Sequence, residues 1–528
     1  MGQSTRDLVI YHKGTDQWHR YPWARVHELA RAIAARILDR ADGACPTVGL
    51  VGEPSLEFVA TLPAVWIAGG SFTVAPGPVR GADPARWAAT TLERFQTAGV
   101  TTVYSHGSTL ELMRAITPGL PVEDLAQVAT DAEVHAGRQA APVRRSDAAI
   151  LQSTAGSTGV PQTVSIPARA VLANVGGLSE RFGIGSADTG CSWLPLYHDM
   201  GLIFLLTCML HGSELWLAPT SAFSAAPMRW LDWLTESQAT LTAAPNFAYN
   251  LVGRFARRIG EVDLGWLRMA LNGGEPVDCD GFARFSDEMA RFGFDPGAAT
   301  PAYGLAEATC AVTAPPLGMG LRHDVTVPPP GDGPSAVKHA LLGTPIAGME
   351  LRVCPTKALA HLGREIGEVE IRGTSMMSGY LGSAPVCTDE WFPTGDLGYL
   401  TADGLVVCGR RKEVIHLAGR NLFPTEIERV AATVAGIRVG GVVATDVALG
   451  GRNGLAIVAE YRGEGHHQAK RQVLECVAAE CGVVASKVEL VDPGALPRTT
   501  SGKLRRTAVR DQLGTGAWAG SVREETRT

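Results

Sequence analysis

The feature that most constrains the fold is an alternation of short apolar runs with longer amphipathic segments, from residue 46 to about residue 310. The short runs are bounded by glycine or proline, which is typical of buried strands, and the longer segments carry apolar residues at helical spacing. Strands that alternate with helices of about 10–15 residues predict parallel sheets covered by helices on both faces. We predict strands at 46–52, 71–76, 100–107, 148–154, 192–197, 213–219, 239–245 and 267–274, and helices at 56–70, 169–182, 229–238, 247–259 and 280–294.

The pattern of residue types changes twice after this region. Residues 317–340 are rich in proline and glycine and are predicted as a loop, and short β-like runs follow at 349–355, 367–373 and 404–409. From residue 410, helical and strand-like segments form a unit large enough to fold alone. We therefore predict an α/β protein with a large N-terminal domain (1–409) of doubly wound sheets plus a β-subdomain, and a small, mobile α+β C-terminal domain (410–528).

Composition excludes several classes of protein. With 528 residues, 45% hydrophobic and 19% charged, the chain is globular, and its net charge of −6 argues against a nucleic-acid partner. The ten cysteines form no CxxC pair, which argues against a zinc ribbon or a disulfide framework and favours a reducing, cytoplasmic setting. No secretory signal is evident, and the longest apolar run, 202–210, is too short for a membrane span, which needs about 20 residues.

The strongest local motif is Ser153-Thr-Ala-Gly-Ser-Thr-Gly159, directly after an apolar run. Small hydroxyl residues and glycines in such a place allow backbone N–H groups and hydroxyls to surround an anion. The motif is not a Walker P-loop, because it lacks the GxxxxGK[ST] pattern. By itself it is equally compatible with a polar surface turn.

Four further segments could surround a nucleotide. The two glycines of 272–276 allow close approach to a flat ligand, 303–308 offers an aromatic face and a carboxylate, and 391–398 places a carboxylate in a tight turn. Near the C-terminus, 496–506 is a basic loop rich in glycine and serine. Taken singly, each segment has a structural explanation: a turn, a core tyrosine, an Asx-turn or a solvated basic tail.

Taken in order, these segments resemble the adenylate-forming superfamily, which includes acyl-CoA synthetases, luciferases, peptide-synthetase adenylation domains and fatty acyl-AMP ligases. The resemblance covers about residues 45–510. Within the superfamily, segments 192–202, 303–309 and 419–427 are most similar to the fatty acyl-AMP ligase branch. Most relatives outside that branch carry threonine where this chain has Ala306.

The resemblance implies an ATP site with Mg²⁺ as a further cofactor. Glu307 would help to hold the Mg²⁺ ion, and Asp396 with Arg410 would hold the ribose hydroxyls. The residues implied to face the phosphates are Thr154, Ser157 and Thr158, and those implied to line the adenine are Gly274, Glu275 and Tyr303.

The resemblance also implies moving and acyl-binding parts. Lys412 would be the hinge, Lys503 would reach into the site during adenylation, and His198 would stand at the mouth of the carboxylate pocket. The aromatic residues that we predict as pocket walls are Trp193, Phe204, Phe247 and Tyr249, although aromatic residues in such segments are more often plain core.

The implied reaction joins a hydrophobic carboxylic acid to AMP at the expense of ATP and then transfers the acyl group to a carrier-protein thiol. The acid is a fatty acid by family default, and a bulky natural-product acid is equally compatible. A nucleophilic carboxylate is ionised at pH 7, so no general base is needed, and the sequence shows no catalytic triad.

Three alternatives stay open. Gln162 stands where many relatives have a lysine, which suits acyl-AMP ligases but also a catalytically weak nucleotide-binding protein. Acyl-AMP ligases usually carry an insertion that disfavours CoA, and none is evident between Gly379 and Trp391, so CoA remains an alternative acceptor. An amino-acid adenylation domain is disfavoured, because 243–249 offers no carboxylate for an ammonium group.

Overall fold

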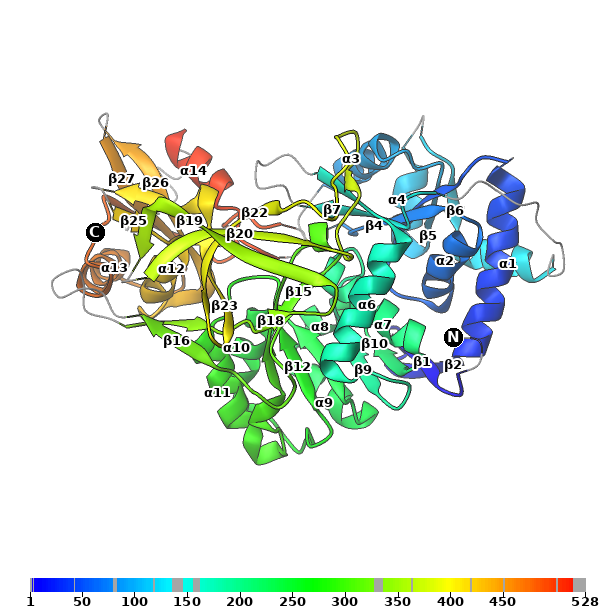
Figure 1. Ribbon diagram of the computed structural model, residues 1–528, viewed down its shortest axis with the longest axis horizontal. Coiled ribbons are helices and arrows are strands. Elements are labelled where there is room, and N and C mark those ends of the chain that lie inside the picture. The colour runs from blue at the N-terminus through cyan, green and yellow to red at the C-terminus, as the bar shows by residue number, and fades with distance from the viewer. Residues whose placement is uncertain are drawn as a thin grey trace, which may run out of the picture.

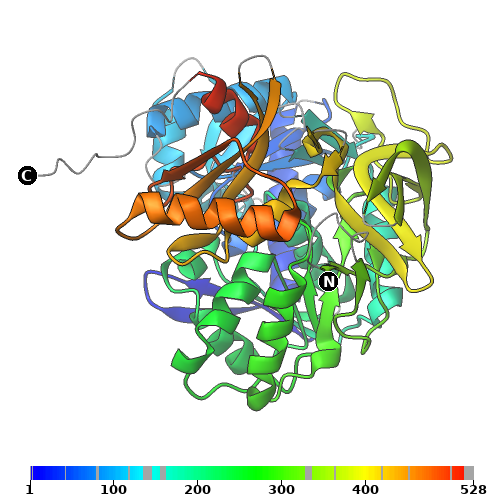
Figure 2. The same cartoon turned by 90° about the vertical axis from the view of Figure 1, so that its left-hand side faces the viewer.

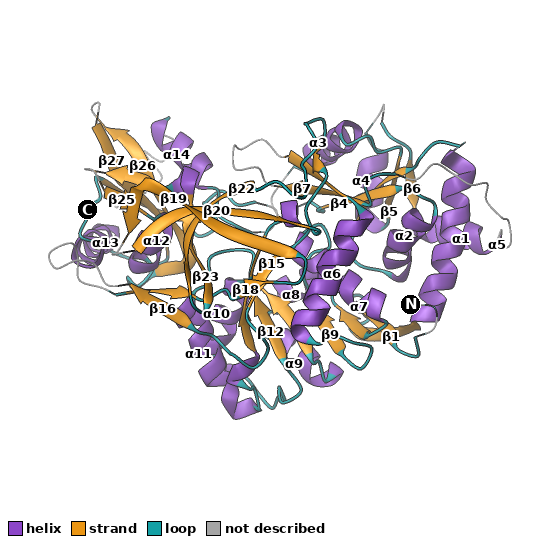
Figure 3. Cartoon of the chain, viewed as in Figure 1, coloured by secondary structure: helices purple, strands orange, loops and turns teal. Residues whose placement is uncertain are grey.

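The computed structural model shows an α/β protein. In Figure 1 the N-terminal elements lie on the right and the C-terminal elements on the left, and Figure 3 colours the elements by type. The residues described are 2, 4–41, 43–78, 83–116, 119–134, 146–154, 162–326, 336–361, 364–417, 420–449, 452–499 and 502–515.

Two seven-stranded sheets form the large part of the molecule. The first sheet has the order β21 (Gly379–Tyr380), β8 (Gln162–Ile166), β7 (Ile150–Thr154), β4 (Ser71–Ala75), β3 (Thr47–Val51), β5 (Thr102–Ser105) and β6 (Val122–Asp124). The second has the order β13 (Ala299–Pro301), β12 (Met269–Asn272), β11 (Leu241–Ala244), β9 (Thr189–Ser192), β10 (Glu214–Leu217), β1 (Asp7–His12) and β2 (Gln17–Pro22). Most neighbouring strands are parallel, which requires the helical crossovers that the sequence predicts.

Helices cover both faces of each sheet. A large core lies between the sheets around α1 (Trp23–Ala41), α2 (Leu56–Ile67), α6 (Ala168–Phe182) and α7 (Asp199–His211). The outer face of the first sheet is covered by α3 (Pro84–Thr97) and α4 (Gly107–Arg114), and α5 (Leu125–Val134) packs against α1. The outer face of the second sheet is covered by α8 (Thr220–Ala225), α9 (Arg229–Ser237), α10 (Asn246–Arg254) and α11 (Cys279–Met289). This confirms the predicted doubly wound α/β architecture.

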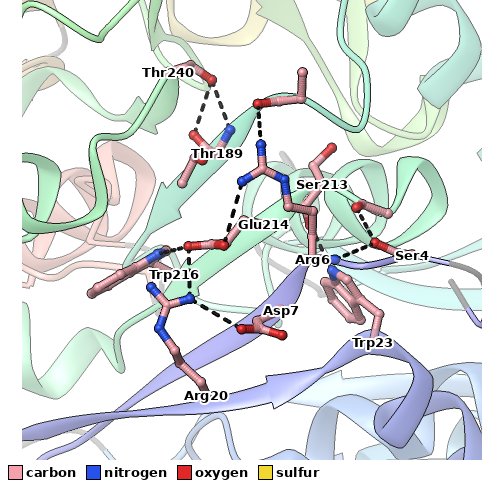
Figure 4. Close-up of polar contacts among 12 residues, drawn as sticks. Ser4, Arg6, Asp7, Arg20, Trp23, Thr189, Ser213, Glu214, Trp216 and Thr240 are labelled. Atoms are coloured by element: carbon pink, nitrogen blue, oxygen red, sulfur yellow. Dashed lines mark hydrogen bonds and ion pairs between the residues drawn. The ribbon is translucent and has the colours of Figure 1, made fainter.

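The first 41 residues, for which the sequence analysis predicted no element, extend the second sheet. Strand β1 pairs in parallel with β10 and in antiparallel with β2. Figure 4 shows the contacts that hold this segment: Arg20 lies 3.3 Å from Asp7 and 3.3 Å from Glu214, and the Trp23 indole donates to the carbonyl of Ser213 at 2.7 Å. The N-terminal segment is therefore an integral part of the fold.

Smaller sheets follow the second large one. A four-stranded antiparallel sheet contains β19 (Met349–His361), β20 (Arg364–Gly373), β22 (Phe392–Thr401) and β23 (Gly404–Arg410). It corresponds to the predicted β-subdomain. Two further small sheets are β14 (Tyr303–Gly304) with β15 (Ala311–Ala314) and β18 (Thr344–Pro345), and β16 (His323–Thr326) with β17 (Val337–Ala340).

The C-terminal elements have hydrophobic clusters of their own. They are β24 (Ile415–Leu417), β25 (Arg420–Leu422), α12 (Pro424–Ala431), β26 (Ile437–Leu449), β27 (Arg452–Tyr461), α13 (His466–Cys481), β28 (Lys487–Val491) and α14 (Arg506–Gly514). Two buried clusters contain only residues of this part, and Figure 2 shows it in front of the large part, with α13 crossing the view. We call this part the C-terminal unit. The exact boundary at 409/410 and the mobility of the unit stay predictions.

Three local predictions need correction. Of 192–197, only Ser192 lies in a strand, because the segment turns at Pro195 before α7. The loop predicted at 317–340 contains β16 and β17, which pair with each other, and its residues 327–335 lie outside the described residues. The predicted tight turn at Asp396 is a bulge within β22, where the register with β20 shifts and the Asp396 N–H donates to Thr394 Oγ1 at 3.1 Å.

Among the helices that the structure describes, none is long and apolar enough to cross a membrane.

Candidate active site

Three of the predicted site residues follow the carboxyl ends of strands in the second sheet. His198 follows β9, Gly274 follows β12 and Tyr303 follows β13. These strands are neighbours through parallel pairing, with β11 between β9 and β12. Carboxyl ends of parallel strands meet at one edge, where open α/β sheets bind ligands. The topology therefore brings segments that are about a hundred residues apart to one edge.

Asp396 is the centre of a buried polar cluster beside this edge. It is paired with Arg410 in the register of β22 and β23, and the Arg410 Nε atom lies 3.1 Å from Asp396 Oδ1. The Tyr303 hydroxyl donates to Asp396 Oδ2 at 2.7 Å. The Asp396 side chain is only 7% exposed. The structure thus joins three residues that the resemblance assigned to adenine and ribose.

The charge of Asp396 acts on both of its partners in this cluster. Burial, reinforced by the charge of Asp396, raises the pKa of Tyr303 well above its usual value. The same carboxylate raises the pKa of Arg410. A carboxylate can accept about four hydrogen bonds, and these two partners leave room for neighbouring hydroxyls of a ligand.

Glu307 is presented by the short 3-10 helix η4 (Ala306–Ala308). The Tyr380 hydroxyl donates to Glu307 Oε1 at 2.8 Å, and the Met377 N–H donates to the Glu307 carbonyl at 2.8 Å. Glu307 also adds to the negative charge that raises the pKa of Arg410. The carboxylate is therefore fixed in orientation, and no described residue bonds to its second oxygen.

The turn after Glu307 is strained. Thr309 has φ +69° and ψ −54°, and the Cys310 N–H donates to the Ala308 carbonyl at 2.8 Å, which is a tight three-residue turn. A β-branched residue in this conformation is costly and persists only where the surroundings hold it. Thr309 Oγ1 donates to the Ser375 carbonyl at 2.7 Å, and the fully buried Asn174 amide donates to the Ala308 carbonyl at 3.2 Å.

His198 is the N-cap of α7 and lies beside the glycine turn. Its Nδ1 atom is 2.7 Å from Asp199 Oδ1, which fixes the orientation of the ring. A Cβ atom built on Gly274, whose φ is +83°, would lie 3.9 Å from His198 Cε1. His198 and Gly274 are thus neighbours at the sheet edge.

Lys503 comes from the C-terminal unit, and its charge is felt at this edge. Burial acts to raise the pKa of Asp199, but the charges of His198 and Lys503 hold it below its usual value. Burial raises the pKa of Glu275, against the opposing charges of Lys503 and Arg506 and hydrogen bonds to Asn246. The charge of Lys503 thus acts on two carboxylates of the large part. That Lys503 enters the site stays a prediction.

The phosphate motif is only partly described. Thr154 ends β7, pairs with Gln162 of β8, and donates from Oγ1 to the Gln162 carbonyl at 3.2 Å. Ser157 and Thr158 lie outside the described residues. Lys412 lies in the 3-10 turn η5 (Arg411–Glu413), directly between β23 and the C-terminal unit.

The four aromatic residues predicted for an acyl pocket have different surroundings. Trp193 stacks on Phe223 at 3.5 Å and lies edge-on to Phe247, which is 49% exposed. Phe204 is partly buried and packs against both large cores. Tyr249 is fully buried, and its hydroxyl donates to the Leu271 carbonyl at 2.9 Å. Its surroundings make Tyr249 part of the core beneath α10, while Phe247 keeps a free face.

Sequence reasoning missed several residues that shape the site. Asp199 follows His198 directly, so its role could have been found locally. Tyr380 is 73 positions from Glu307, and Asn174 is 134 positions from Ala308, so no local pattern could have indicated these contacts.

Comparisons with known proteins extend over nearly the whole chain. A family model described as AMP-binding enzyme matches residues 2–381. The chain is 35% identical over 517 residues to the ligase Rv1013 of Mycobacterium tuberculosis, covering 92% of this chain and 93% of that protein. It is 32% identical over 409 residues to the fatty-acid–CoA ligase FadD21 of Mycobacterium tuberculosis, covering 69% and 70%. A solved structure from a study of fatty acyl-adenylate ligases of E. coli and L. pneumophila aligns with a TM-score of 0.87 and 28% identity, covering 98% and 97%.

Proposed function

The chain belongs to the AMP-binding enzyme family, and on this premise we propose that it activates a hydrophobic carboxylic acid and passes the acyl group to a carrier-protein thiol. It is an ATP-dependent acyl-adenylate-forming ligase. In the first half-reaction a carboxylate oxygen attacks the α-phosphorus of ATP, the bond from that phosphorus to the bridging oxygen breaks, and pyrophosphate leaves. In the second, the thiol replaces AMP on the acyl carbon, which gives a thioester and AMP.

The chemistry needs positive charge and positioning more than proton transfer. A carboxylic acid is already ionised at pH 7, so its attack needs no general base. The obstacle is the approach of one anion to a polyanion, and fixed positive charges with exact alignment lower that barrier. The residues at the sheet edge supply both.

The Asp396 cluster is assigned to the ribose. With Tyr303 and Arg410 occupying one position on each carboxylate oxygen, Asp396 can accept from two neighbouring hydroxyls of the sugar. Tyr303 and the Gly274-Glu275 turn follow the neighbouring strands β13 and β12, and this place at the sheet edge suits the adenine.

Glu307 fits the assigned magnesium ion. Mg²⁺ is usually held by one or two carboxylates together with substrate phosphates. The second Glu307 oxygen provides one such ligand, and the described residues contain no cluster of three side chains that could hold the ion without ATP. When bound, the ion would neutralise charge on the phosphates. Tyr380 keeps the carboxylate oriented toward them.

The electrostatic effect of Lys503 on the large part is the single observation that carries the proposal. Lys503 comes from a unit with its own core, and its charge acts on Glu275 and Asp199 of the other part. In this arrangement its ammonium can meet the charge that develops on the transferred phosphoryl group. We assign Lys412 as the hinge about which the C-terminal unit turns, so that Lys503 withdraws when the thiol enters.

The same comparisons support a choice of substrate and acceptor. A fatty acid is favoured by the likeness to fatty acyl-adenylate ligases, and Phe247, which is edge-on to Trp193, offers an exposed apolar face. The same likeness favours a carrier protein over CoA, although one relative is named as a fatty-acid–CoA ligase. The ten unpaired cysteines support a cytoplasmic setting.

The test is ATP–pyrophosphate exchange with the purified protein across a panel of fatty and aromatic acids. We expect exchange that depends on a hydrophobic acid, and its absence with every acid would contradict the proposal. The best acid is then supplied with either CoA or a phosphopantetheinylated carrier protein, and the products are weighed by mass spectrometry. Acyl-CoA formed as fast as acyl-carrier would move the protein to the CoA-ligase class.

A further inference from the structure

A fully buried carboxylate lies in the C-terminal unit, away from the carboxylates described above. Glu460 is on β27, and its side chain has no exposed surface. Opposite it, the register of β26 shifts between Ile437 and Val442, so that Glu460 faces a bulge. Burying a charge is costly unless it is paired, and bulges often serve to redirect groups near functional sites.

Glu460 is incompletely compensated. Arg438 Nη1, from the bulge, lies 2.8 Å from Glu460 Oε2, and Arg498 Nη2 lies 4.0 Å from the same oxygen. Glu460 Oε1 has no hydrogen-bond partner among the described residues. A Cβ atom built on Gly441 would lie 2.8 Å from Glu460 Oε2, so a side chain at position 441 would collide with the carboxylate. An apolar side chain would stabilise this core at least as well, so packing alone does not explain Glu460.

Arg498 connects this carboxylate to the segment that carries Lys503. Its Nη1 atom donates to the Gly502 carbonyl at 2.9 Å, and its Nη2 atom donates to the Gly440 carbonyl at 2.5 Å. One guanidinium therefore joins the bulge of β26 to the carbonyl immediately before Lys503. A planar guanidinium with donors in a fixed fork is suited to holding two acceptors at once.

We call the segment 497–505 the Lys503 hairpin, and its described residues are joined to one another by backbone bonds. The Thr499 N–H donates to the Lys503 carbonyl at 2.7 Å, and the Arg505 N–H donates to the Pro497 carbonyl at 2.9 Å. These bonds fix the hairpin internally. Arg498 is the side chain that joins it to the bulge of β26, on the body of the C-terminal unit.

We propose that Glu460 and Arg498 are positioning residues that aim the Lys503 hairpin at the active site: Glu460 holds the guanidinium, and the guanidinium holds the carbonyl before Lys503. This inference rests on the role proposed above for Lys503. It extends that role to residues that touch neither ATP nor the acid, and it predicts an effect on adenylation alone.

The experiment compares the two half-reactions in three single variants. Adenylation is measured by ATP–pyrophosphate exchange, and transfer is measured with acyl-AMP made beforehand. We expect Arg498→Gln to slow adenylation about ten- to a hundredfold, and Glu460→Gln about three- to tenfold, with transfer within about twofold of the unaltered enzyme. The matched control is Arg438→Gln, which removes a partner of the same carboxylate without a bond to the hairpin, and it should stay within about twofold in both assays.

A double-variant cycle distinguishes an effect on the position of Lys503 from a general loss of structure. In a Lys503→Ala background the change Arg498→Gln should slow adenylation no further, because the group being aimed is already gone. If Arg498→Gln does not fold, Arg498→Lys decides, since it keeps the charge beside Glu460 but cannot bridge both carbonyls. Unaltered adenylation in the Arg498 variants, or equal losses in both half-reactions, would overturn the inference while Lys503→Ala remains slow. Full activity in Lys503→Ala would instead overturn the proposed role of Lys503.

Discussion

Asp396 and Lys503 are assigned to the same reaction, yet the molecule holds them in contrasting ways. The Asp396 side chain is 7% exposed and pairs with Arg410 on the neighbouring strand. Its carboxylate accepts a hydrogen bond from the hydroxyl of Tyr303, which lies in another sheet. Lys503 projects from a surface hairpin of the C-terminal unit, where Arg498 provides the link to β26. On the proposed assignment, the nucleotide side is built before the ligand arrives, and the catalytic charge would be delivered by the C-terminal unit. A rigid nucleotide site, together with a lysine that can be withdrawn, suits an enzyme that must perform two reactions in turn.

The largest effect should come from removing the delivered charge. We expect Lys503→Ala to slow acyl-AMP formation by about two to three decades, the usual loss when one positioned charge or donor is removed from a transition state. Transfer from pre-made acyl-AMP should change far less. Lys470→Ala, which removes a lysine of the same unit that pairs with Glu489 at 2.9 Å, is the control and should leave both rates unchanged. Equal slowing of both half-reactions would contradict a role for Lys503 in adenylation alone.

A smaller loss is expected on the prebuilt side. Glu307→Gln should slow adenylation about tenfold or more and raise the Mg²⁺ concentration needed for half-maximal rate, because it removes a hard anionic ligand. A magnesium titration of the exchange rate measures both. Glu350→Gln, at an exposed ion pair with Arg372, is the control. An unchanged titration would mean that Glu307 serves the fold only.

The hinge prediction concerns the link between the two regions. Lys412→Pro fixes φ at η5, so the turn of the C-terminal unit should become difficult while one closed arrangement stays accessible. We expect transfer to slow about tenfold and adenylation to slow less. Lys412→Ala removes the side chain but keeps the backbone free and is the control. Transfer at the full rate in the proline variant would place the hinge elsewhere.

The smallest effect on activity should come from a carboxylate at the opposite end of the second sheet. Asp188 precedes β9 and binds Arg268 through both oxygens, at 2.8 and 2.6 Å. Burial acts to raise the pKa of Asp188, but the hydrogen bonds from Arg268, Gly185 and Thr240 hold it below the usual value. We expect Asp188→Asn to cost roughly 2 kcal/mol of stability at pH 7 without changing either rate.

The depressed pKa of Asp188 predicts how the stability difference between the two proteins changes with pH. A carboxyl whose folded pKa is depressed stabilises the fold above its unfolded pKa, and this contribution is lost as the pH falls through the folded pKa. Thermal melting of the Asp188→Asn variant and of the unaltered protein should therefore differ most near neutral pH and converge under acid conditions. A constant difference down to the most acidic pH would contradict the ionic explanation.

How far the sequence predicts this molecule depends on how local the signal is. The alternation of apolar runs predicts the strands around Leu50 and Leu241 because a buried parallel strand is apolar along its length. The second strand of the edge hairpin, β2, is mostly exposed, so it left no such pattern. In the site, Tyr303, Asp396 and Arg410 are predicted by motif, but the Tyr380–Glu307 bond depends on strand β21 meeting the 3-10 helix η4 in space.

The most direct test of the central claim follows oxygen atoms. The enzyme is given ATP, Mg²⁺, a carrier protein and a fatty acid whose carboxyl oxygens are both ¹⁸O. If the carboxylate attacks the α-phosphorus, one labelled oxygen crosses to AMP when the thiol takes the acyl group, and pyrophosphate carries no label. Mass spectrometry of the released AMP and pyrophosphate should show this distribution. AMP without the label, formed together with labelled thioester, would contradict an acyl-adenylate intermediate.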